Sequence, residues 1–433
     1  QGAGQVAAML GVLQAGAAYV PLDPLAPAAR LDAVVRDAGL RIVVSERPAL
    51  NSPASTWLRD SGLELILLDE LPAAPLAPLT LPSGSPDDLA YLLYTSGTTG
   101  TPKRVAQTQR NVLHYVRSWA ENLALTPADR LSLVSTYGYD AAVQDIFGAL
   151  LSGAAVYPLD IRRLDRETLL DRIADAGISV LHATPTVYRY LFGSHVACRQ
   201  DLSRVRLIVL GGEAARRADF ELFRSRFRKG AQFVNGYGLT EATAVLQAFA
   251  MHDTQPYGTV LSLGWPVGDQ RVLLLDDQGQ GAGVSGEVVI ESRYVPAGRL
   301  HTGDLARYLP DGSFAWIGRR DDQLKLGGIR IEPGEIESAL RTHPALAAVA
   351  VVLYVESASE PMLVAYCSLQ PAVTMPTPAE LRAWLKPLLP DALLPARYIV
   401  LDSLPQLPNG KLDRRALTGR PLPRLVAAGR TAV

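Results

Sequence analysis

Short apolar runs alternate with amphipathic stretches along the first part of the chain. Residues 28–38 place apolar side chains at helical spacing, and a strand-like apolar run at 41–45 follows. The pattern returns from residue 111, where a helix to about residue 124 precedes the apolar run 131–136. Strands that alternate with helices in this way predict an α/β architecture with a parallel sheet.

The pattern changes after about residue 264. The stretches 271–277 and 284–294 are typical of β-strands, and Asp311-Gly312 predicts a hairpin turn. The charged stretch 318–323 reads as a linker in which Arg320 and Asp322 are solvated. The last 100 or so residues alternate helical and strand patterns and predict a small α+β domain. Its expected helices and strands cover 333–341, 348–354, 362–368, 377–388 and 398–405.

A glycine- and hydroxyl-rich stretch follows the apolar run 91–94. Its glycines let the backbone approach an oligophosphate closely, its hydroxyls and amides donate hydrogen bonds, and Lys103 adds a positive charge. Pro102 precedes Lys103 and Arg104 follows it, so this is not the P-loop of kinases and GTPases. A polar turn between two strands is the simpler alternative. The segment consists of Thr95, Ser96, Gly97, Thr98, Thr99, Gly100, Thr101, Pro102 and Lys103.

A second candidate segment is the stretch 235–243, which is predicted to be a loop. Two glycines flank Tyr237, and a hydroxyl and a carboxylate lie side by side at Thr240 and Glu241. A carboxylate next to a phosphate site indicates a Mg²⁺ ligand, because Mg²⁺ prefers one or two carboxylates together with phosphate oxygens. Asp140, His182 and Gly211 lie at predicted strand ends, where ligands gather in open α/β sheets.

Composition narrows the class of protein. The chain has 433 residues, enough for two or three domains, with 42 basic against 43 acidic side chains. This balance does not favour nucleic acid or an anionic membrane as a partner, and no apolar run is long enough to span a bilayer. Cys198 and Cys367 lie far apart and in no metal-ligand spacing, so reduced cysteines and a cytoplasmic location are expected. The opening residues have no signal-peptide pattern and read as the interior of a domain.

Seven segments in order resemble the adenylation domain of nonribosomal peptide synthetases, a member of the adenylate-forming superfamily. They are LQAGAAYVPLDP at 13–24, YTSGTTGTPK at 94–103, YDAAVQDIFG at 139–148, NGYGLTEAT at 235–243, HTGDL at 301–305, GRRDDQLKLGGIRIEPGEIE at 318–337 and LPNGKLDR at 407–414. The resemblance runs from the first residues to about Leu417.

The resemblance implies an α/β fold whose large N-terminal core, with parallel-type sheets and a β-rich subdomain, covers 1–320. A small mobile C-terminal domain would follow at 321–418, with Asp321 as the hinge and 419–433 as a tail. Such domains condense an amino acid with ATP and Mg²⁺ to aminoacyl-AMP and release pyrophosphate. They then pass the acyl group to the phosphopantetheine thiol of a carrier protein, in the biosynthesis of natural products such as antibiotics.

The resemblance also assigns site residues. Lys411 would bridge the substrate carboxylate, the ribose and the α-phosphate; Glu241 would bind Mg²⁺; and Thr240 would lie beside the phosphates. Cations at these positions suit the reaction, because attack of a carboxylate on a phosphate brings two anions together. The other nucleotide-binding residues it implies are the phosphate-loop residues 95–100 with Lys103, then Gly212, Glu213, Asn235, Tyr237, Gly238, Asp304 and Arg319.

Asp140 aligns with the aspartate that pairs with the α-ammonium of the substrate, which favours an α-amino acid. The aligned pocket residues are Asp140, Ala141, Gln144, His182, Ile208, Leu210, Gly236, Ala244, Val245 and Lys411. Gln144 and His182 are the neutral hydrogen-bonding groups of this set, with no charge to meet a charged side chain, so charged amino acids are disfavoured. A small amino acid, polar like serine or cyclic like proline, is expected.

Some features depart from the family pattern. The family's helix-rich segment upstream of residue 13 and its long loop between Val295 and Arg299 are absent, either lost or left out of this sequence. Arg104 replaces a glycine, Leu239 a proline and Gly327 an arginine. No carrier motif is present, so the carrier is expected on another part of the chain or another protein; a condensation domain and an MbtH-like protein are further possible partners. Alternatives are an acyl- or aryl-CoA ligase, against which Asp140 and residues 407–414 weigh, and a degenerate domain that binds without catalysis.

Overall fold

The computed structural model describes residues 2–47, 54–71, 82–97, 102–193, 198–355, 361–371, 373–407, 412–420 and 422. Contacts divide the chain into a larger unit, which extends to Ile331, and a smaller unit from Glu332 onward. The hinge predicted at Asp321 concerns a motion between them and stays a prediction. Each unit is described by itself.

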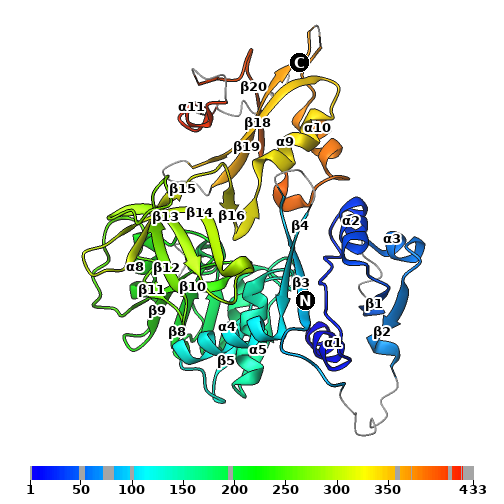
Figure 1. The fold of residues 1–433 in the computed structure, drawn as a ribbon. Helices are drawn as coiled ribbons and strands as arrows, with labels where there is room; N and C mark the ends of the chain where they lie inside the picture. Colours follow the sequence, from blue (N-terminus) through cyan, green and yellow to red (C-terminus); the bar gives the residue numbers. More distant parts are fainter. Residues whose placement is uncertain are drawn as a thin grey trace. The chain divides into compact units, whose positions relative to one another are not determined.

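A seven-stranded sheet organises the larger unit (Figure 1). Its order is β11-β10-β9-β8-β7-β5-β6, and the neighbours from β6 to β9 run parallel while β10 and β11 are antiparallel. The predicted parallel α/β core is thus confirmed. The strands are β5 (Arg130–Leu133), β6 (Ala155–Pro158), β7 (Val180–Ala183), β8 (Leu207–Leu210), β9 (Gln232–Leu239), β10 (Thr243–Ala250) and β11 (Trp265–Pro266).

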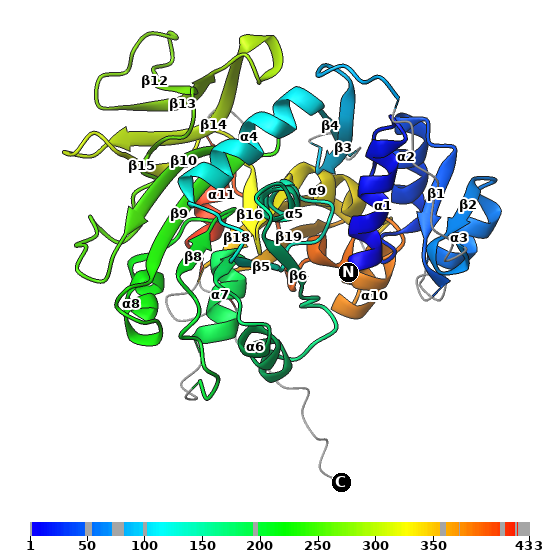
Figure 2. The ribbon, with the colours of Figure 1, turned by 90° about the horizontal axis from the view of Figure 1, so that it is seen from below.

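Helices cover the two faces of this sheet because successive strand residues point to opposite sides. Val209 of β8 packs with Trp119 on the face of α4 and α5, whereas Ile208 packs with Phe220 on the face of α6, α7 and α8 (Figure 2). Thr108 caps α4 by accepting a hydrogen bond from the backbone N–H of Asn111. The helices are α4 (Gln109–Asn122), α5 (Asp140–Leu151), α6 (Arg166–Asp175), α7 (Pro185–Phe192) and α8 (Arg217–Arg226).

The segments before the sheet form smaller elements. β3 and β4 make an antiparallel hairpin, and Tyr19 forms an isolated bridge with Tyr91. Residues 72–81 lie outside the described residues. These elements are α1 (Ala3–Gln14), α2 (Ala28–Ala38), β1 (Ile42–Ser45), α3 (Ala54–Asp60), β2 (Glu64–Leu67), η2 (Leu68–Glu70), β3 (Leu89–Thr95) and β4 (Lys103–Thr108).

The β-rich part predicted after residue 264 is an antiparallel sheet of order β12-β13-β14-β15. The predicted turn at Asp311-Gly312 joins β14 to β15. The short hairpin β16–β17 was not predicted, and Arg320 is not merely solvated, because it pairs with Asp277 and Glu287. The elements are β12 (Arg271–Leu275), β13 (Ser285–Glu291), η3 (Pro296–Gly298), β14 (Arg299–Tyr308), β15 (Phe314–Arg319), β16 (Leu324–Leu326) and β17 (Ile329–Ile331).

The smaller unit has the predicted α+β pattern, with β19 pairing antiparallel to β18 and parallel to β20. Glu337 joins its elements, because this buried carboxylate accepts hydrogen bonds from the backbone N–H of Val351 and the guanidinium of Arg414. The elements are α9 (Pro333–Arg341), β18 (Leu346–Tyr354), β19 (Met362–Leu369), α10 (Pro378–Leu385), η4 (Asp391–Leu393), β20 (Arg397–Val400) and α11 (Arg414–Thr418). Across the described part of both units, no helix combines the length and the apolar character needed to cross a bilayer.

Candidate active site

The predicted phosphate loop joins the two strands of the β3–β4 hairpin. Thr95 ends β3 and pairs with Lys103 at the start of β4. The buried Thr95 hydroxyl has no hydrogen-bond partner among the described residues, while the Ser96 hydroxyl donates to the carbonyl of Arg330. Gly97 is buried beside Ser96. The predicted residues Thr98, Thr99 and Gly100 lie outside the described residues.

Glu241 is the carboxylate that the sequence assigns to Mg²⁺, and two cations hold it. The Lys103 ammonium lies 2.8 Å from Oε1, and the Arg330 guanidinium lies 3.2 Å from both carboxylate oxygens. Burial alone raises the pKa of Glu241, but Arg330 and Lys103 outweigh it, so this pKa is lowered and the carboxylate is ionised. We call these three side chains the Glu241 cluster. Sequence reasoning missed Arg330, because nothing local to residue 330 indicates Glu241.

A buried amide fixes the backbone of the same turn. The Gln107 side chain donates to the carbonyls of Thr240 at 3.1 Å and Glu241 at 3.3 Å. Asn111 in turn donates to the Gln107 carbonyl oxygen at 2.8 Å and to the backbone carbonyl of Tyr294 at 3.2 Å. Sequence reasoning also missed this pair. The available signal was the period-2 pattern of β4, which places Gln107 inward with Val105.

The stretch 235–243 is not the loop that the sequence predicts. Asn235 to Leu239 belong to β9, which turns back into β10 within a few residues. The turn is tight because a Cβ on Gly238 would lie 1.9 Å from the carbonyl oxygen of Thr243. Thr243 itself adopts a left-handed conformation with φ 59°. Pairing of β9 with β10 therefore holds Thr240 and Glu241 at the tip of a hairpin.

A second buried carboxylate, Asp304, lies among several donors. Its oxygens accept hydrogen bonds from the Tyr237 hydroxyl at 2.8 Å and the Trp316 indole at 3.1 Å, and they lie 3.0 Å from the Arg319 guanidinium. The Lys325 ammonium lies 5.6 Å from the centre of the Tyr237 ring, and burial lowers the pKa of Lys325. The structure thus brings together the predicted residues Tyr237, Asp304 and Arg319.

The remaining predicted nucleotide residues have partners of their own. Glu213 accepts hydrogen bonds from the backbone N–H and hydroxyl of Thr186. Asn235 donates to the carbonyl of Ser262 at 2.7 Å, and Asp321 pairs with Arg319. Gly212 has φ 81°, and a Cβ added there would lie 3.4 Å from the Cα of Gly328 in the β16–β17 turn.

The predicted amino-acid pocket gathers on the α4/α5 face of the sheet. Asp140 and Ala141 begin α5, and Gln144 lies one turn after Asp140 on the same helix face. His182 projects from β7 toward these helices, and its Nδ1 lies 2.8 Å from Oδ1 of Asp145. Burial raises the pKa of Asp140. Sequence reasoning missed Asp145, so the expected pocket did not include this carboxyl group beside His182.

Other predicted pocket residues lie elsewhere. Ile208 and Leu210 are buried on the opposite face of β8, in the core formed with α6, α7 and α8. Val245 is buried in the core under the β-rich sheet. Gly236 and Ala244 belong to the β9–β10 hairpin, where the Gly236 carbonyl comes within 3.5 Å of a Cβ placed on Gly211. The structure therefore does not bring Ile208, Leu210 and Val245 together with Gln144 and His182.

Lys411, the predicted catalytic lysine, lies outside the described residues. Within the described ranges no group of three or more His, Cys, Asp and Glu side chains could hold a metal ion by itself. Mg²⁺ nevertheless takes few protein ligands when phosphate oxygens supply the rest. Glu241, an ionised and buried carboxylate that two cations balance, therefore fits Mg²⁺ as a single protein ligand. Glu241 is the residue that would hold it.

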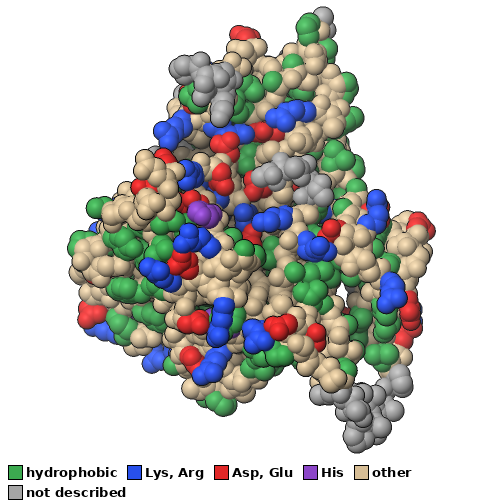
Figure 3. Space-filling model, viewed as in Figure 1, with side chains coloured by type: hydrophobic (Ala, Val, Ile, Leu, Met, Phe, Trp, Pro, Cys, Tyr) green, Lys and Arg blue, Asp and Glu red, His purple; other side chains and the backbone are tan. Residues whose placement is uncertain are grey.

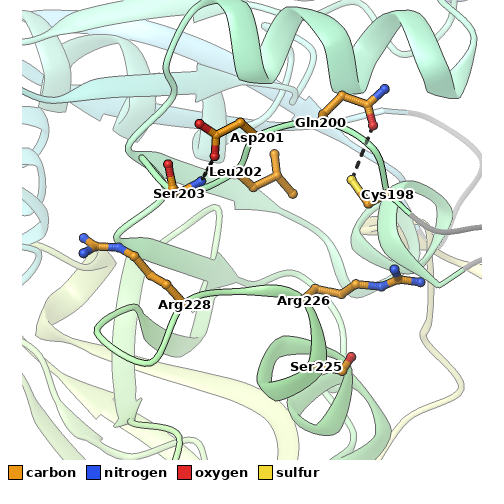
Figure 4. A pocket seen from close by; sticks show the side chains of 8 residues that line it. All are labelled: Cys198, Gln200, Asp201, Leu202, Ser203, Ser225, Arg226 and Arg228. Carbon is orange, nitrogen blue, oxygen red and sulfur yellow. Dashed lines mark hydrogen bonds between the residues drawn. The ribbon is translucent and has the colours of Figure 1, made fainter.

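The surface adds little to this picture. On the face that Figure 3 shows, Lys and Arg side chains lie among Asp and Glu side chains, as the net charge of −1 leads one to expect. A hollow of about 360 Å³ opens beside α8 and contains none of the predicted residues. Its Arg226 and Arg228 side chains point away from each other, so they do not converge on one anion (Figure 4).

Comparisons with known proteins identify relatives of the whole chain. Residues 1–298 match the family model of AMP-binding enzymes, and residues 335–411 match that of the AMP-binding enzyme C-terminal domain. Tyrocidine synthase 2 of Brevibacillus parabrevis is 32% identical over 441 residues, and surfactin synthase subunit 2 of Bacillus subtilis is 34% identical over 451 residues. Each alignment covers 95% of this chain but 12% of the relative, so the chain spans about one eighth of these proteins.

Solved structures show the same fold. An NRPS protein containing adenylation and PCP domains, bound to a vinylsulfonamide inhibitor, matches with a TM-score of 0.79 and 26% identity over 96% of this chain and 73% of that one. o-Succinylbenzoate CoA synthetase of Bacillus subtilis matches with a TM-score of 0.82 and 24% identity over 97% and 87%. The chain therefore belongs to the AMP-binding enzyme family, whose adenylate-forming fold it shares.

Proposed function

We propose that this chain is an adenylation domain that activates an α-amino acid with ATP and transfers it to a carrier protein in nonribosomal peptide synthesis. The observation that carries the proposal is the Glu241 cluster. It joins the end of the phosphate loop, the β9–β10 hairpin and the β16–β17 hairpin, three segments distant in sequence, at one carboxylate. The named relatives, tyrocidine synthase 2 and surfactin synthase subunit 2, support a role in peptide synthesis.

The reaction begins with the amino acid and the nucleotide both bound. Asp140 pairs with the α-ammonium of the amino acid, while the Asp304 carboxylate binds the ribose hydroxyls and Tyr237 stacks on the adenine. A substrate carboxylate oxygen then attacks the α-phosphate, and the bond from that phosphorus to pyrophosphate breaks. Lys103 and Lys411 neutralise charge that develops at the phosphates. Bound Mg²⁺ supplies further neutralisation of the phosphate oxygens.

The second half-reaction needs a carrier partner. The thiol of its phosphopantetheine arm attacks the acyl carbon and releases AMP. We propose that Asp321 is the hinge about which the smaller domain turns between the two steps, and that residues 419–433 are a linker. A condensation domain and an MbtH-like protein are additional partners in this proposal. The amino acid is small, like serine or proline.

Amino-acid-dependent exchange of pyrophosphate into ATP tests this function. We expect exchange with at least one small α-amino acid, and loss of that exchange in Asp140→Ala, because the ammonium then has no counter-charge. An alternative acid-CoA ligase activity would instead give exchange with acids that lack an α-amino group and no dependence on Asp140. Exchange with no acid at all, in protein that melts cooperatively, would sink the proposal.

A further inference from the structure

A chain of side-chain amides leads from the Glu241 turn into α4. The amide nitrogen of Gln107 donates to two backbone carbonyls of the turn, and that of Asn111 donates to the Gln107 carbonyl oxygen at 2.8 Å and to the backbone carbonyl of Tyr294 at 3.2 Å. An amide nitrogen has two hydrogens and an amide oxygen has none. A Gln107 amide turned by 180° would therefore set its oxygen against the two carbonyls, so these side chains hold one orientation. We call Gln107 and Asn111 the amide chain.

The far end of the amide chain holds Tyr294 at two points. Asn111 binds its backbone carbonyl, and His114, one helix turn further along the same face of α4, stacks on its ring. The two ring centres lie 3.6 Å apart and the ring planes differ by 10°. The His114 side chain is 15% exposed, and its Nε2 lies 3.2 Å from Oδ1 of Asp269. α4 thus holds residues 292–295 through both the backbone and the ring of Tyr294.

Little free space separates the Glu241 turn from residues 292–295. The cavity that the turn, α4 and these residues line has a volume of about 10 Å³, room for about one water molecule. Val295 is buried in the same core as Ala242 of the turn. Close-packed side chains do not absorb a displacement in such a space. A shift of Tyr294 is therefore passed on to the amide chain and to the turn.

We propose that Asn111 and Tyr294 are positioning residues for the adenylation reaction, because they hold the turn from which the Glu241 carboxylate meets Mg²⁺. This inference rests on the proposed function. Asn111 acts through Gln107, and Tyr294 acts through Asn111, so neither needs to reach a substrate. Both residues lie outside the seven segments that resemble the family.

The amide chain supports Glu241 differently from the two cations. Lys103 and Arg330 contact the carboxylate, whereas Gln107 contacts the backbone carbonyl of the same residue. The carboxylate can therefore exchange its cations for Mg²⁺ while the backbone contact stays. The turn keeps its position while the charges around it change.

Substitutions in the amide chain, alone and combined, test the order in which it acts. We expect Asn111→Leu to raise the Mg²⁺ concentration for half-maximal exchange of pyrophosphate about threefold to tenfold, because Gln107 loses the partner that fixes its amide. The double variant with Gln107→Leu should be no worse than Gln107→Leu alone, and losses that add would overturn the inference. Asn122→Leu is the matched control, because it removes an amide pair with Gln247 at the other end of α4 and should leave this concentration unchanged.

The ring of His114 tests the part that Tyr294 plays. Burial lowers the pKa of His114, an effect that Asp269 opposes only in part, so the ring is neutral at pH 7 and a phenyl ring can replace it in the stack. We expect His114→Ala to shift the Mg²⁺ dependence in the direction of Asn111→Leu, and His114→Phe to restore the wild-type value. Equal values in both variants would overturn the role of Tyr294.

Hydrogen exchange of backbone amides gives a measurement without Mg²⁺ or turnover. In the ligand-free chain, peptides that cover residues 239–245 should exchange faster in Asn111→Leu and His114→Ala than in Asn122→Leu and His114→Phe, because a turn without its support opens more often. Where Asn111→Leu does not fold, the two His114 variants make the same comparison. Equal exchange in supported and unsupported variants would overturn the inference.

The outcomes separate this inference from the proposed function. Amino-acid-dependent exchange of pyrophosphate that keeps its Mg²⁺ dependence in Asn111→Leu rejects the positioning role and keeps the function. Absence of pyrophosphate exchange with every acid rejects the function and the positioning role together. A shifted Mg²⁺ dependence in Asn111→Leu and His114→Ala, with faster hydrogen exchange in the turn, supports both.

Discussion

Glu241 and Asp145 are both buried acidic side chains with basic partners, but the partners differ in their freedom to move. The Lys103 side chain on Glu241 is 55% exposed, and Arg330 belongs to a short hairpin. His182 is instead enclosed in the middle of the parallel sheet, 8% exposed. A long, half-exposed side chain such as Lys103 can leave the carboxylate for phosphate oxygens, whereas an enclosed pair keeps one arrangement. The first region thus suits a changing set of charges, and the second suits a fixed one.

Removal of the Glu241 charge should lower the exchange activity more than any other change proposed here. We expect Glu241→Gln to lower exchange about 100-fold or more, because the turn would lose the proposed Mg²⁺ ligand and leave Lys103 and Arg330 without their counter-charge. The measurement is exchange rate against Mg²⁺ concentration. Glu291→Gln removes a partly exposed carboxylate that pairs with Arg271 and Arg299, and it should have little effect. Equal losses in both variants would contradict a special role for Glu241.

The backbone support of the same turn should matter less than its charge. Gln107→Leu keeps the side-chain volume but leaves the carbonyls of Thr240 and Glu241 without their donor. If the loss of these hydrogen bonds removes about 1–2 kcal/mol of transition-state stabilisation, kcat should fall about tenfold. Because Gln107 hydrogen-bonds to none of Asp140, Gln144 and His182, the KM for the amino acid should change less than kcat. Gln109→Leu, two residues on, is the control, and a KM effect confined to the amino acid would argue against a role in holding the turn.

Arg330 should set the lower pH limit of the exchange activity that depends on Glu241. The pKa of Glu241 is lowered in the folded chain, so its ionised form persists above that pKa and is lost as the pH falls through it. Arg330→Gln removes one of the two cations and should move the acid limb of the exchange profile to higher pH. Arg320→Gln, whose partners are Asp277 and Glu287, should leave the limb in place. A profile that does not shift in Arg330→Gln would show that Lys103 alone holds the charge.

A third buried pair should affect stability without affecting either region. Burial raises the pKa of Asp129, but hydrogen bonds from Arg206 and Ser179 outweigh it and lower the pKa to about 2. Its contribution is therefore present above the unfolded pKa of about 4 and is lost between about pH 4 and 2. We expect Asp129→Asn to lower the free energy of unfolding by about 1–2 kcal/mol at neutral pH and to leave exchange rates unchanged. Urea denaturation at pH 7 and pH 3 measures this, and equal stability of the variant and the wild type at pH 7 would contradict it.

Sequence patterns predicted most of the helices and strands, because they depend on local periodicity and capping. The helix over 28–38 and that over 333–341 have the bounds that their patterns predict. Prediction from local sequence patterns failed where strand pairing between segments far apart in the chain decides the conformation. The stretch 235–243 has the glycines and polar residues of a loop, yet pairing with β8 and β10 makes most of it strand.

The sequence by itself determined the family, the α/β core and the identity of Glu241, Asp304 and Asp140 as candidate site residues, since these follow from ordered motifs and short-range spacing. Only the tertiary structure decided which side chains meet: Arg330 with Glu241, Gln107 with the turn at Thr240, and Asp145 with His182. It also separated Ile208 and Leu210 from His182. His182 pairs with Val209, so its side chain points to the same face as that of Val209 and away from those of Ile208 and Leu210. Such contacts join residues far apart in the chain, and no local pattern encodes them.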